Sequence, residues 1–352
     1  MSHGHFVRGT RHALIHAQPL ILALMALALV AMILVATGSG STDIPLHDVW
    51  RIVAWHLGMP GVEADWSAGR DNIVWQVRLP RALLGAVVGA CLALVGAALQ
   101  AVTRNTLADP HLLGISSGAA LGAIVVLLHT GLFLGSLTVP LFAFAGALMS
   151  TALVVSVTRF TDASDAGRMV LAGVAVSFVL TSLGSLAIFL GDARATHTVI
   201  FWMLGGLGLA QWSHLPYPLA ALMSCGLYLL WNARRFNAMT LGDETATTLG
   251  IPAGRFRMAA FVVCTLLTGT AVAFSGMISF VGLMVPHVVR MVVGGDYRRV
   301  LPLSALTGAV FLVAADIVAR SITPPQDMPL GVITGLAGGL FFIGLMRKRS
   351  GR

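Results

Sequence analysis

Apolar and polar positions along this chain separate into long blocks instead of alternating residue by residue. Apolar runs recur from the first, at 19–37, to the last, at 329–346. Each run has about the 20 residues that a helix needs to cross roughly 30 Å of hydrocarbon. The runs between these two lie at 79–103, 111–130, 138–158, 168–190, 215–232, 257–274, 277–294 and 301–320. The pattern predicts an all-α membrane protein, a polytopic bundle of about ten transmembrane helices.

Four polar segments complete the expected organisation. Residues 1–18 form a tail with four histidines, which we interpret as a basic leader because nothing rigid would fix a metal-ligand geometry. Residues 38–78 contain four tryptophans, and because Trp favours the interface we expect this segment to lie along the outer membrane surface. Residues 233–256 form a polar loop, and 347–352 form a basic tail. One membrane domain, 19–346, is therefore expected between two short tails.

Composition and charge narrow the class of protein. Hydrophobic residues make up 57% of the 352 residues and charged residues 10%, with a mean hydropathy of +0.87. Such values exclude a protein with a large water-soluble core. The net charge of +8 would suggest nucleic acid in a soluble protein, but loops that meet anionic lipid heads explain it better here, so no nucleic-acid partner is expected. The three cysteines lie inside apolar runs without a C-x-x-C pair and are interpreted as buried, unreactive thiols.

The distribution of basic residues predicts the orientation of the bundle. If the N-terminus is cytoplasmic, ten spans place 16 of the 22 lysines and arginines on the inner side and 6 on the outer side. Short cytoplasmic loops carry an excess of this kind. We therefore expect both termini and the 233–256 loop in the cytoplasm. The outer residues are Arg51, Arg70, Arg78, Arg81, Arg194 and Arg320.

One short stretch within that loop is unusually polar for its surroundings: Leu241-Gly-Asp-Glu-Thr-Ala-Thr-Thr-Leu-Gly-Ile-Pro252. It holds two adjacent acids and three threonines, and arginines flank it on both sides. We interpret it as a cytoplasmic handle that a separate, energy-supplying subunit grips. Gly242 and Gly250 are its expected bounds, and Asp243 and Glu244 its expected contact charges. The stretch 241–252 is called the handle below.

Motifs for catalysis are weak. Gly114-Ile-Ser-Ser-Gly118 matches G-x-S-x-G, but a nucleophile elbow needs a strand, a turn and a helix, whereas this stretch opens an apolar helix and predicts packing or a pore-lining face. A phosphate-binding loop needs the lysine of G-x-x-x-x-G-K-[ST], and the sole lysine, Lys348, lies between two arginines. The chain therefore cannot hydrolyse ATP by itself. We predict no catalytic residue, no metal site and no cofactor of its own.

Charges and glycines within the spans predict packing. Asp316 and Arg320 stand four residues apart on one predicted helix, so they can form an ion pair that lowers the cost of burying each charge. A structural pair and a role in docking a partner both remain open. Glycine pairs with G-x-x-x-G spacing let helix backbones approach closely. They are Gly85 and Gly89, Gly118 and Gly122, and Gly335 and Gly339.

Six pieces in order carry a family resemblance. They are Arg78-Leu-Pro-Arg81, Asn105-Thr-Leu-Ala-Asp-Pro110 running into Leu113-Gly-Ile-Ser-Ser-Gly-Ala119, Phe201-Trp-Met-Leu-Gly205, Leu241-Gly-Asp-Glu-Thr-Ala246, Gly276-Met-Ile-Ser-Phe-Val-Gly-Leu-Met-Val-Pro-His287 and Pro325-Gln-Asp-Met-Pro-Leu-Gly-Val-Ile-Thr334. With them the chain resembles the FecCD-type permeases of binding-protein-dependent ABC importers over nearly its whole length. Thr106 stands where the family usually has Pro, and Gly339-Leu340 replaces a more usual Ala/Gly-Pro.

The resemblance implies a transport subunit and not an enzyme. Family members are homodimers in the bacterial inner membrane, with the pathway along the two-fold axis and lined mainly by spans five and ten. Two cytoplasmic ATPase subunits, which bind the ATP and Mg, dock on the loop between spans six and seven. A substrate-binding protein docks outside, its glutamates meeting arginines of the permease. The residues implied for the ATPase contact are Leu241, Gly242, Asp243, Glu244, Thr245, Leu249 and Gly250; for docking, Arg78, Arg81 and Arg320; for the pathway or gate, Asn105, Ser116, Ser117, Gly118, Gly331 and Thr334.

The expected cargo is an iron chelate moved by alternating access. A ferric siderophore comes first on the breadth of the family, with haem next and cobalamin third. No cluster of His, Tyr or Met along spans five and ten calls for haem. An ion-coupled secondary transporter would need several intramembrane carboxylates, and only Asp316 qualifies. An intramembrane hydrolase would use Ser116, for which no partner base is apparent.

Overall fold

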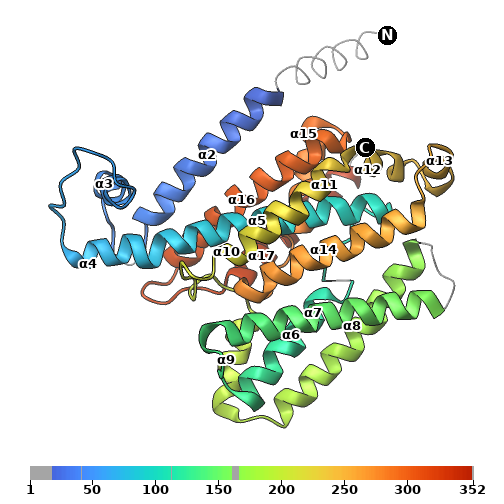
Figure 1. Ribbon diagram of the computed structural model, residues 1–352, viewed down its shortest axis with the longest axis horizontal. Helices are drawn as coiled ribbons and strands as arrows, with labels where there is room; N and C mark the ends of the chain where they lie inside the picture. Colours follow the sequence, from blue (N-terminus) through green and yellow to red (C-terminus); the bar gives the residue numbers. More distant parts are fainter. Residues whose placement is uncertain (1–17, 41, 112, 161–165, 351–352) are drawn as a thin grey trace.

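Long helices that run along one common direction form this protein (Figure 1). The computed structural model describes residues 18–40, 42–111, 113–160 and 166–350. Within these ranges there is no strand. The tail predicted at 1–18 lies outside the described residues except for Gln18, as do residues 351 and 352. Seven described helices are long and apolar enough to cross a membrane, and shorter apolar helices occur at Ile115–Thr130 and Val281–Val293. The predicted all-α membrane bundle is confirmed.

Each predicted span corresponds to helix over most of its length. Span six is the continuous segment 216–231, in which a π-helical turn joins two short α-helices. The long spans are α2 (Gln18–Gly38), α5 (Leu79–Thr103), α7 (Thr138–Phe160), α8 (Ala166–Phe189), α14 (Ala253–Ser275), α16 (Tyr297–Ser321) and α17 (Leu330–Ser350). The shorter elements are α3 (Leu46–His56), α4 (Ala68–Asp71), η1 (Asn72–Arg78), α6 (Ile115–Val125), η2 (Val126–Thr130), η3 (Gly135–Leu137), α9 (Ala193–Met203), α10 (Pro216–Ala221), η4 (Leu222–Gly226), α11 (Leu227–Trp231), α12 (Ala233–Thr240), α13 (Asp243–Thr248) and α15 (Val281–Val293).

Two spans begin later than the apolar runs predict. The run at 111–130 becomes helical only at Ile115, and the run at 277–294 only at Val281. Each start follows a residue in the left-handed backbone region, Gly114 at φ 84° and Phe280 at φ 68°. A left-handed residue cannot continue an α-helix, and for an aromatic side chain this conformation is strained. Hydropathy alone does not detect such breaks, because the residues before them are as apolar as those after.

The segment 38–78, predicted to lie along the outer membrane surface, contains a helix that crosses the direction of the spans. Figure 1 shows α3 end-on at the left, while α5 and α14 run along the long axis of the picture. Val49 and Ile52 of α3 are buried in a small apolar cluster with Val74 of η1. The ring of His56 stacks on Trp75 at 4.1 Å. From Ala68 onward the segment is one continuous helix with α5.

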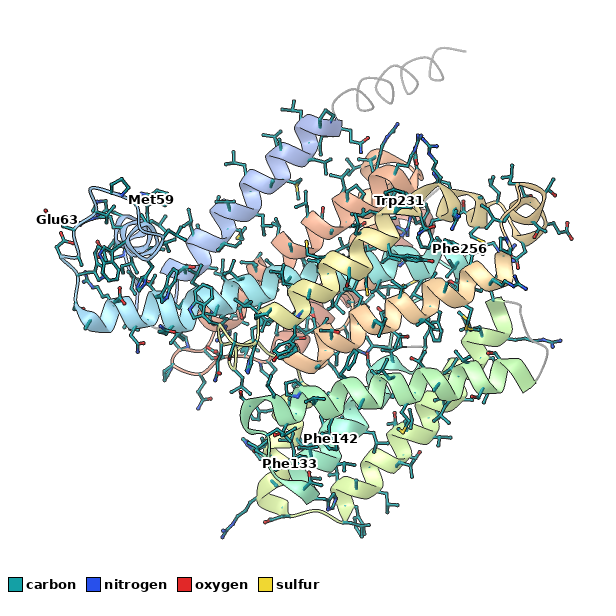
Figure 2. All side chains as sticks on the ribbon, in the orientation of Figure 1. Met59, Glu63, Phe133, Phe142, Trp231 and Phe256 are labelled. Carbon is teal, nitrogen blue, oxygen red and sulfur yellow. The ribbon has the colours of Figure 1, made fainter. Side chains whose placement is uncertain are left out.

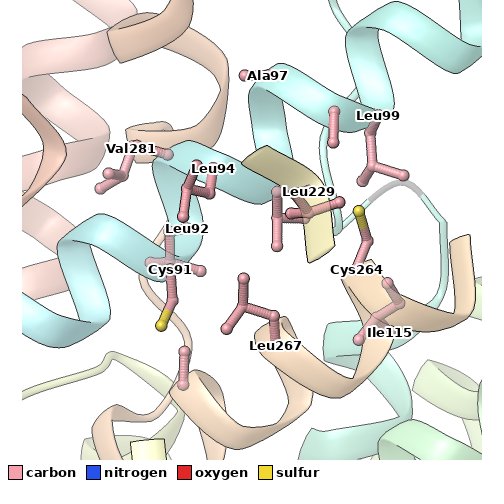
Figure 3. Close-up of a cluster of buried hydrophobic side chains, with 14 of the residues drawn as sticks. Cys91, Leu92, Leu94, Ala97, Leu99, Ile115, Leu229, Cys264, Leu267 and Val281 are labelled. Carbon is pink, nitrogen blue, oxygen red and sulfur yellow. The ribbon is translucent and has the colours of Figure 1, made fainter. Parts of the chain in front are cut away.

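The centre of the bundle is α5, which is buried along nearly its whole length and is surrounded by α14, α15 and α16. Glycines make this close packing possible. A Cβ atom at Gly96 would lie 1.8 Å from the Gly282 carbonyl oxygen of α15, and one at Gly89 would lie 2.2 Å from the Gly308 carbonyl oxygen of α16. Only glycine fits at either crossing. Cys91 of α5 and Cys264 of α14 lie in the same buried cluster as Leu267 (Figure 3).

Three helices present large apolar side chains outward. The N-terminal helix α2, α8 and α17 bury only small parts of their apolar surface within the chain. On α8 the exposed residues include Phe178, Leu183 and Phe189, and on α17 they include Leu336 and Leu340. Apolar surfaces of this extent suit contact with lipid or with another membrane chain.

Candidate functional site

The handle forms a short helical excursion that projects from the bundle. It lies between α12 and α14, and its own helix is α13. Figure 1 shows α13 at the right end, opposite α3 and α4. Gly242 (φ 113°) starts α13 and Gly250 (φ 80°) follows its end, so the predicted bounds coincide with the two left-handed turns of the backbone. Glycine reaches this region without the steric cost that other residues incur.

Asp243 faces the bundle. Its carboxylate accepts two hydrogen bonds of 2.6 Å from the Arg257 guanidinium, and Arg104 approaches it at 3.9 Å. Arg257 is buried, and its Nε donates to the Val102 carbonyl oxygen at 3.0 Å. This ion pair, in which one guanidinium nitrogen donates to both carboxylate oxygens, therefore fixes the start of α13 to the C-terminal end of α5. Asp243 thus positions the handle, and its carboxylate faces arginines of the same chain.

Other handle residues face away from the bundle. Leu241 is 67% exposed and Leu249 is 61% exposed, on either side of α13. Glu244 and Thr245 are exposed between them. In the part of the chain that the structure describes, no basic group lies within 4 Å of the Glu244 carboxylate. Two large apolar residues around a free carboxylate form a surface suited to a protein partner.

Helix α12 connects the handle to α16. Asn237 donates to Asp296 Oδ1 at 2.8 Å, and its own Oδ1 accepts from the Tyr297 amide at 2.8 Å. The hydrogen bonds from the Arg298 side chain, together with those from Asn237 and the Arg298 amide, hold the pKa of Asp296 far below its ordinary value despite partial burial. This carboxylate is therefore charged at physiological pH, and the connection persists there.

A buried polar contact continues from this end into the bundle. Arg290 of α15 donates to Gln100 Oε1 of α5 at 2.6 Å, and Gln100 donates to the Gly282 carbonyl oxygen at 3.2 Å. Next to Gly282, the ring of Phe280 packs on Gly338 of α17, where a Cβ atom would meet it at 2.4 Å. Contacts thus link α5, α15 and α17.

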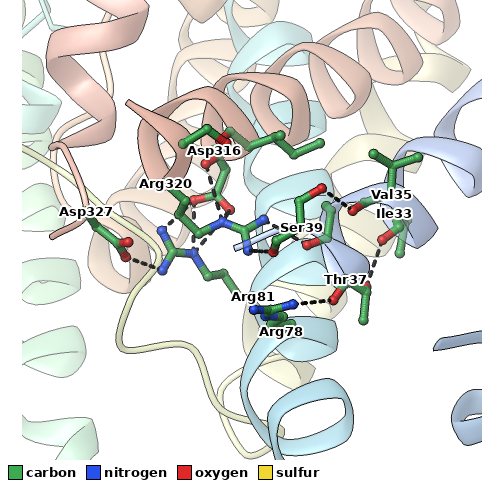
Figure 4. A network of polar contacts seen from close by, with 12 residues as sticks. Ile33, Val35, Thr37, Ser39, Arg78, Arg81, Asp316, Arg320 and Asp327 are labelled. Atoms are coloured by element: carbon green, nitrogen blue, oxygen red, sulfur yellow. Dashed lines mark hydrogen bonds and ion pairs between the residues drawn. The ribbon is translucent and has the colours of Figure 1, made fainter. Parts of the chain in front are cut away.

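A network of charges lies at the other end of α5 (Figure 4). Asp316, only 2% exposed, accepts hydrogen bonds from Arg81 at 2.8 to 3.1 Å and an ion pair from Arg320 at 3.0 Å. The predicted pair of Asp316 and Arg320 is therefore confirmed. Asp327, in the connection between α16 and α17, pairs with Arg81 at 2.5 Å and is 45% exposed.

The three arginines expected to dock a partner lie within this network. Arg78 is buried and donates to the carbonyl oxygens of Gly38 at 2.7 Å and Thr42 at 2.6 Å. Arg320 donates to the carbonyl oxygens of Ser39 and Ala36 at 2.8 and 2.9 Å. The network thus joins the ends of α2, α5 and α16. Asp316 and Asp327 supply the carboxylates for Arg81 and Arg320, and the charge of Asp43 acts on Arg78.

The expected pathway and gate residues lie at several places instead of forming one site. Asn105 is exposed near the handle, where its Oδ1 accepts from the Leu107 amide. Ser116 and Ser117 begin α6, and Gly118 lies against Gly146 of α7. Gly331 and Thr334 begin α17; the Gly331 amide donates to the Leu204 carbonyl oxygen, and the Thr334 hydroxyl donates to that of Gly331.

Several of the sequence pieces that carry the family resemblance meet where helices are interrupted. The Leu330 amide donates to the Gly205 carbonyl oxygen at 2.9 Å, and the Gly206 amide donates to the Ser275 carbonyl oxygen at 2.8 Å. His111 Nε2 lies 3.2 Å from the Ile278 carbonyl oxygen. Segments far apart in the sequence are thus joined by main-chain hydrogen bonds, as irregular backbone inside a membrane protein requires.

The hydrolase alternative finds no support at Ser116. This residue lies in an α-helix and is buried, and no strand precedes it among the described residues. Its hydroxyl oxygen has no hydrogen-bond partner in the described part of the chain, so no base activates it. The nearby His111 contacts a main-chain oxygen instead.

Some structurally important residues were not predicted. The partners of Asp243 are Arg257 and Arg104, and the second carboxylate on Arg81, beside Asp316, is Asp327. Asn237, Gln100 and Phe280 were not singled out either. Arg257 and Asp327 do lie within or beside pieces named in the sequence analysis, but the sequence offers no means of choosing their partners.

Comparison with known proteins defines the family. The sequence profile of the FecCD transport family matches residues 27–348, and the chain belongs to this family. The cobalamin import system permease protein BtuC of Halobacterium salinarum is 38% identical over 351 residues, covering 97% of this chain and 92% of the relative. The hemin transport system permease protein HmuU of Yersinia pestis is 38% identical over 297 residues, covering 82% and 88%.

A solved structure agrees with the sequence relatives. A transporter in an inward-facing conformation, assigned to the metal-chelate type of ABC transporter, matches with a TM-score of 0.81 and 29% identity. The match covers 94% of this chain and 99% of that chain. The protein is therefore a multi-pass permease subunit of an ABC importer and not an enzyme; the ATPase is a separate subunit.

Proposed function

We propose that this permease imports a ferric siderophore across the bacterial inner membrane by alternating access, as a homodimer driven by two ATPase subunits. The handle is the observation that carries the proposal. It offers an outward apolar and acidic surface, while Asp243 fixes it inward to Arg257. Such an element passes on the motion of a partner, because one side is free to bind and the other is attached to the bundle.

The contacts around the handle suggest how motion travels. ATP binding brings the two ATPase subunits together and displaces α12 and α13. The Asp243–Arg257 pair carries this displacement to α5 and α14, and Asn237 carries it to the start of α16. From α5, the hydrogen bond of Gln100 to the Gly282 carbonyl oxygen passes the motion to α15. The contact of Phe280, just before α15, with Gly338 passes it to α17. The permease makes no covalent bond at any step.

The outward faces of α8 and α17 support a homodimer. These helices are spans five and ten, and their exposed residues are mainly Leu, Phe, Val and Ile. A Cβ atom at Gly335 or Gly339 would meet nothing within 4 Å, whereas the Gly85–Gly89 and Gly118–Gly122 pairs are filled by neighbouring helices. An open G-x-x-x-G pair on such a face suits close approach of a second copy.

The outer network supports docking of an acidic partner. The partial exposure of Asp327 makes Arg81 accessible to a partner when Asp327 moves away. A glutamate of a substrate-binding protein could then replace the Asp327 carboxylate at Arg81. Asp316 would keep its contacts with Arg81 and Arg320 throughout.

The side chains along spans five and ten favour a cargo that keeps its metal within its own ligand. Neither α8 nor α17 contains a histidine, a tyrosine or a cysteine, so these helices supply no such ligand to an iron ion. Haem iron has open axial positions, and these two helices offer it no His, Tyr or Cys as an axial ligand. Relatives import cobalamin and hemin, so related permeases accept bulky metal chelates of different kinds.

Competitive uptake tests the cargo. Cells that express the permease with its ATPase and binding protein, and that lack other importers, receive ⁵⁵Fe-siderophore, ⁵⁷Co-cobalamin or haem. We expect ATP-dependent accumulation of the siderophore and little uptake of the other two. The control uses an ATPase partner without its phosphate-binding lysine. Preferred uptake of cobalamin or haem would overturn the cargo assignment, and uptake that persists in the control would overturn the ATP-driven mechanism.

A further inference from the structure

Span six carries a groove that the transport function does not use. The groove has a volume of about 420 Å³ and follows one face of the segment from η4 through α11 into α12. Its lining positions recur every three or four residues, as expected for one side of a helix. They are Ser224, Leu227, Tyr228, Trp231, Asn232 and Arg235.

The groove changes from apolar to cationic along its length. Met223 and Leu227 are exposed on the part inside the predicted span. Trp231, where α11 ends, is 85% exposed (Figure 2). Arg234 and Arg235, one helical turn beyond Trp231, are exposed. An exposed tryptophan between an apolar face and two arginines is typical of the boundary between hydrocarbon and lipid headgroups.

Arg235 is held in the groove, and neither it nor the neighbouring Arg234 has a carboxylate partner among the described residues. The Arg235 guanidinium donates to Asn232 Oδ1 at 3.0 Å, and Asn232 Nδ2 donates to the Tyr228 carbonyl oxygen at 2.8 Å. Asn232 is itself buried, so it fixes the direction of Arg235. Among the described residues, no Asp or Glu oxygen lies within 4 Å of Arg234 or Arg235. Their positive charge is therefore available to an external anion.

We propose that this groove binds an anionic phospholipid of the cytoplasmic leaflet. Its phosphate contacts Arg234 and Arg235, and one acyl chain follows Leu227 and Met223 with Trp231 beside the glycerol region. The order of the groove, apolar at one end and cationic at the other, is the order of acyl chain and phosphate in one lipid molecule. A soluble partner would leave the apolar half uncovered, because that half lies within the span. The leaflet assignment rests on the proposed function, because the ATPase subunits that act on the handle are cytoplasmic.

The position of this lipid gives it a consequence for coupling. Arg234 and Arg235 belong to α12, which leads into the handle. Asn237, less than one turn further along, joins α12 to the start of α16. A lipid phosphate on the two arginines holds α12 at the membrane surface, from which α13 projects. The lipid would thus stabilise the handle in the place where the ATPase finds it.

Lipid selectivity of the purified permease alone tests the proposal. Native mass spectrometry compares retention of phosphatidylglycerol with retention of phosphatidylcholine from mixed micelles. One arginine near an anionic surface contributes about 1 kcal/mol, or about fivefold, so two predict a preference of about 30-fold. In Arg234→Gln with Arg235→Gln, we expect this preference to fall to about one. Arg255→Gln is the matched control, because Arg255 is exposed near the handle but lies outside the groove.

Two further variants make the outcome decisive. Arg234→Lys with Arg235→Lys keeps the charge and should keep most of the preference, which separates charge from a general folding effect. Phosphatidylglycerol with brominated chains should quench tryptophan fluorescence more than the brominated choline lipid does, and Trp231→Phe should remove that difference. No preference in the wild-type chain, or an equal loss in the Arg255 control, would overturn the proposal. Because no ATPase is present, neither result bears on transport itself.

Discussion

Replacing Leu241 and Leu249 together with aspartate is expected to abolish capture of the ATPase subunits. Both side chains are exposed and contact solvent, so their replacement should leave the bundle folded. Under the proposed function they are the apolar anchors of the handle in the complex, and burying one leucine contributes about 1.5–3 kcal/mol. Loss of both should weaken ATPase binding by about a thousandfold, on the order of 4 kcal/mol. Co-purification with a tagged ATPase subunit measures this loss.

The acidic residues of the handle provide the matched comparison. Glu244→Gln removes one exposed charge and should reduce capture only modestly, as rim charges usually do. Asp243→Asn should instead lower the thermal stability of the permease itself, because the neutral amide removes the charge that faces the buried Arg257 and leaves only one oxygen to accept from it. The cost is about 1–3 kcal/mol. If the double aspartate variant captures wild-type amounts of ATPase, the handle is not the docking element.

The second large effect is expected at the outer network, where Asp316→Asn should destabilise the permease. The substitution leaves Arg81 and Arg320 without their shared carboxylate in a site with little access to water. Removing one member of a buried charge group costs about 3–5 kcal/mol. We expect a clear fall in the detergent melting temperature and in the yield of monodisperse protein. Fluorescence-detected size-exclusion chromatography after heating measures both.

Asp327→Asn is the control for this prediction. Asp327 is partly exposed, and among the described residues its one close ion pair is with Arg81, so its loss should cost about 1 kcal/mol or less. The same variant frees Arg81 and should strengthen docking of the binding protein. Charge reversal of Arg78, Arg81 and Arg320 gives no such clean result, because it also breaks their internal contacts. Equal melting temperatures for Asp316→Asn and Asp327→Asn would contradict the structural role assigned to Asp316.

The spans could be predicted from the sequence because a long apolar run in a membrane satisfies its own backbone hydrogen bonds only as a helix. The start of α15 could not, because it depends on Phe280 adopting a left-handed conformation that packing against Gly338 stabilises. The open space beside Gly335 and the filled space beside Gly89 share the same G-x-x-x-G spacing. The G-x-x-x-G spacing alone therefore does not show whether another helix of the same chain packs against the pair.

Local contacts of the candidate site were predictable and distant ones were not. The pair of Asp316 and Arg320 follows from their separation of four residues on one helix. Arg81 is 235 residues away from Asp316, and no pattern in the sequence relates the two. The handle could be located from its unusual polarity, but four arginines flank it, and only the structure selects Arg257 as the partner of Asp243.

The central claim is that this permease moves cargo only when a separate ATPase displaces its handle. Concentrative uptake of a ferric siderophore into proteoliposomes tests it most directly, with the permease, the ATPase and the binding protein supplied separately. We predict uptake only when all three proteins and ATP are present, and none when the permease carries aspartate at Leu241 and Leu249. Uptake by the permease without the ATPase, driven by an imposed ion gradient, would contradict the account.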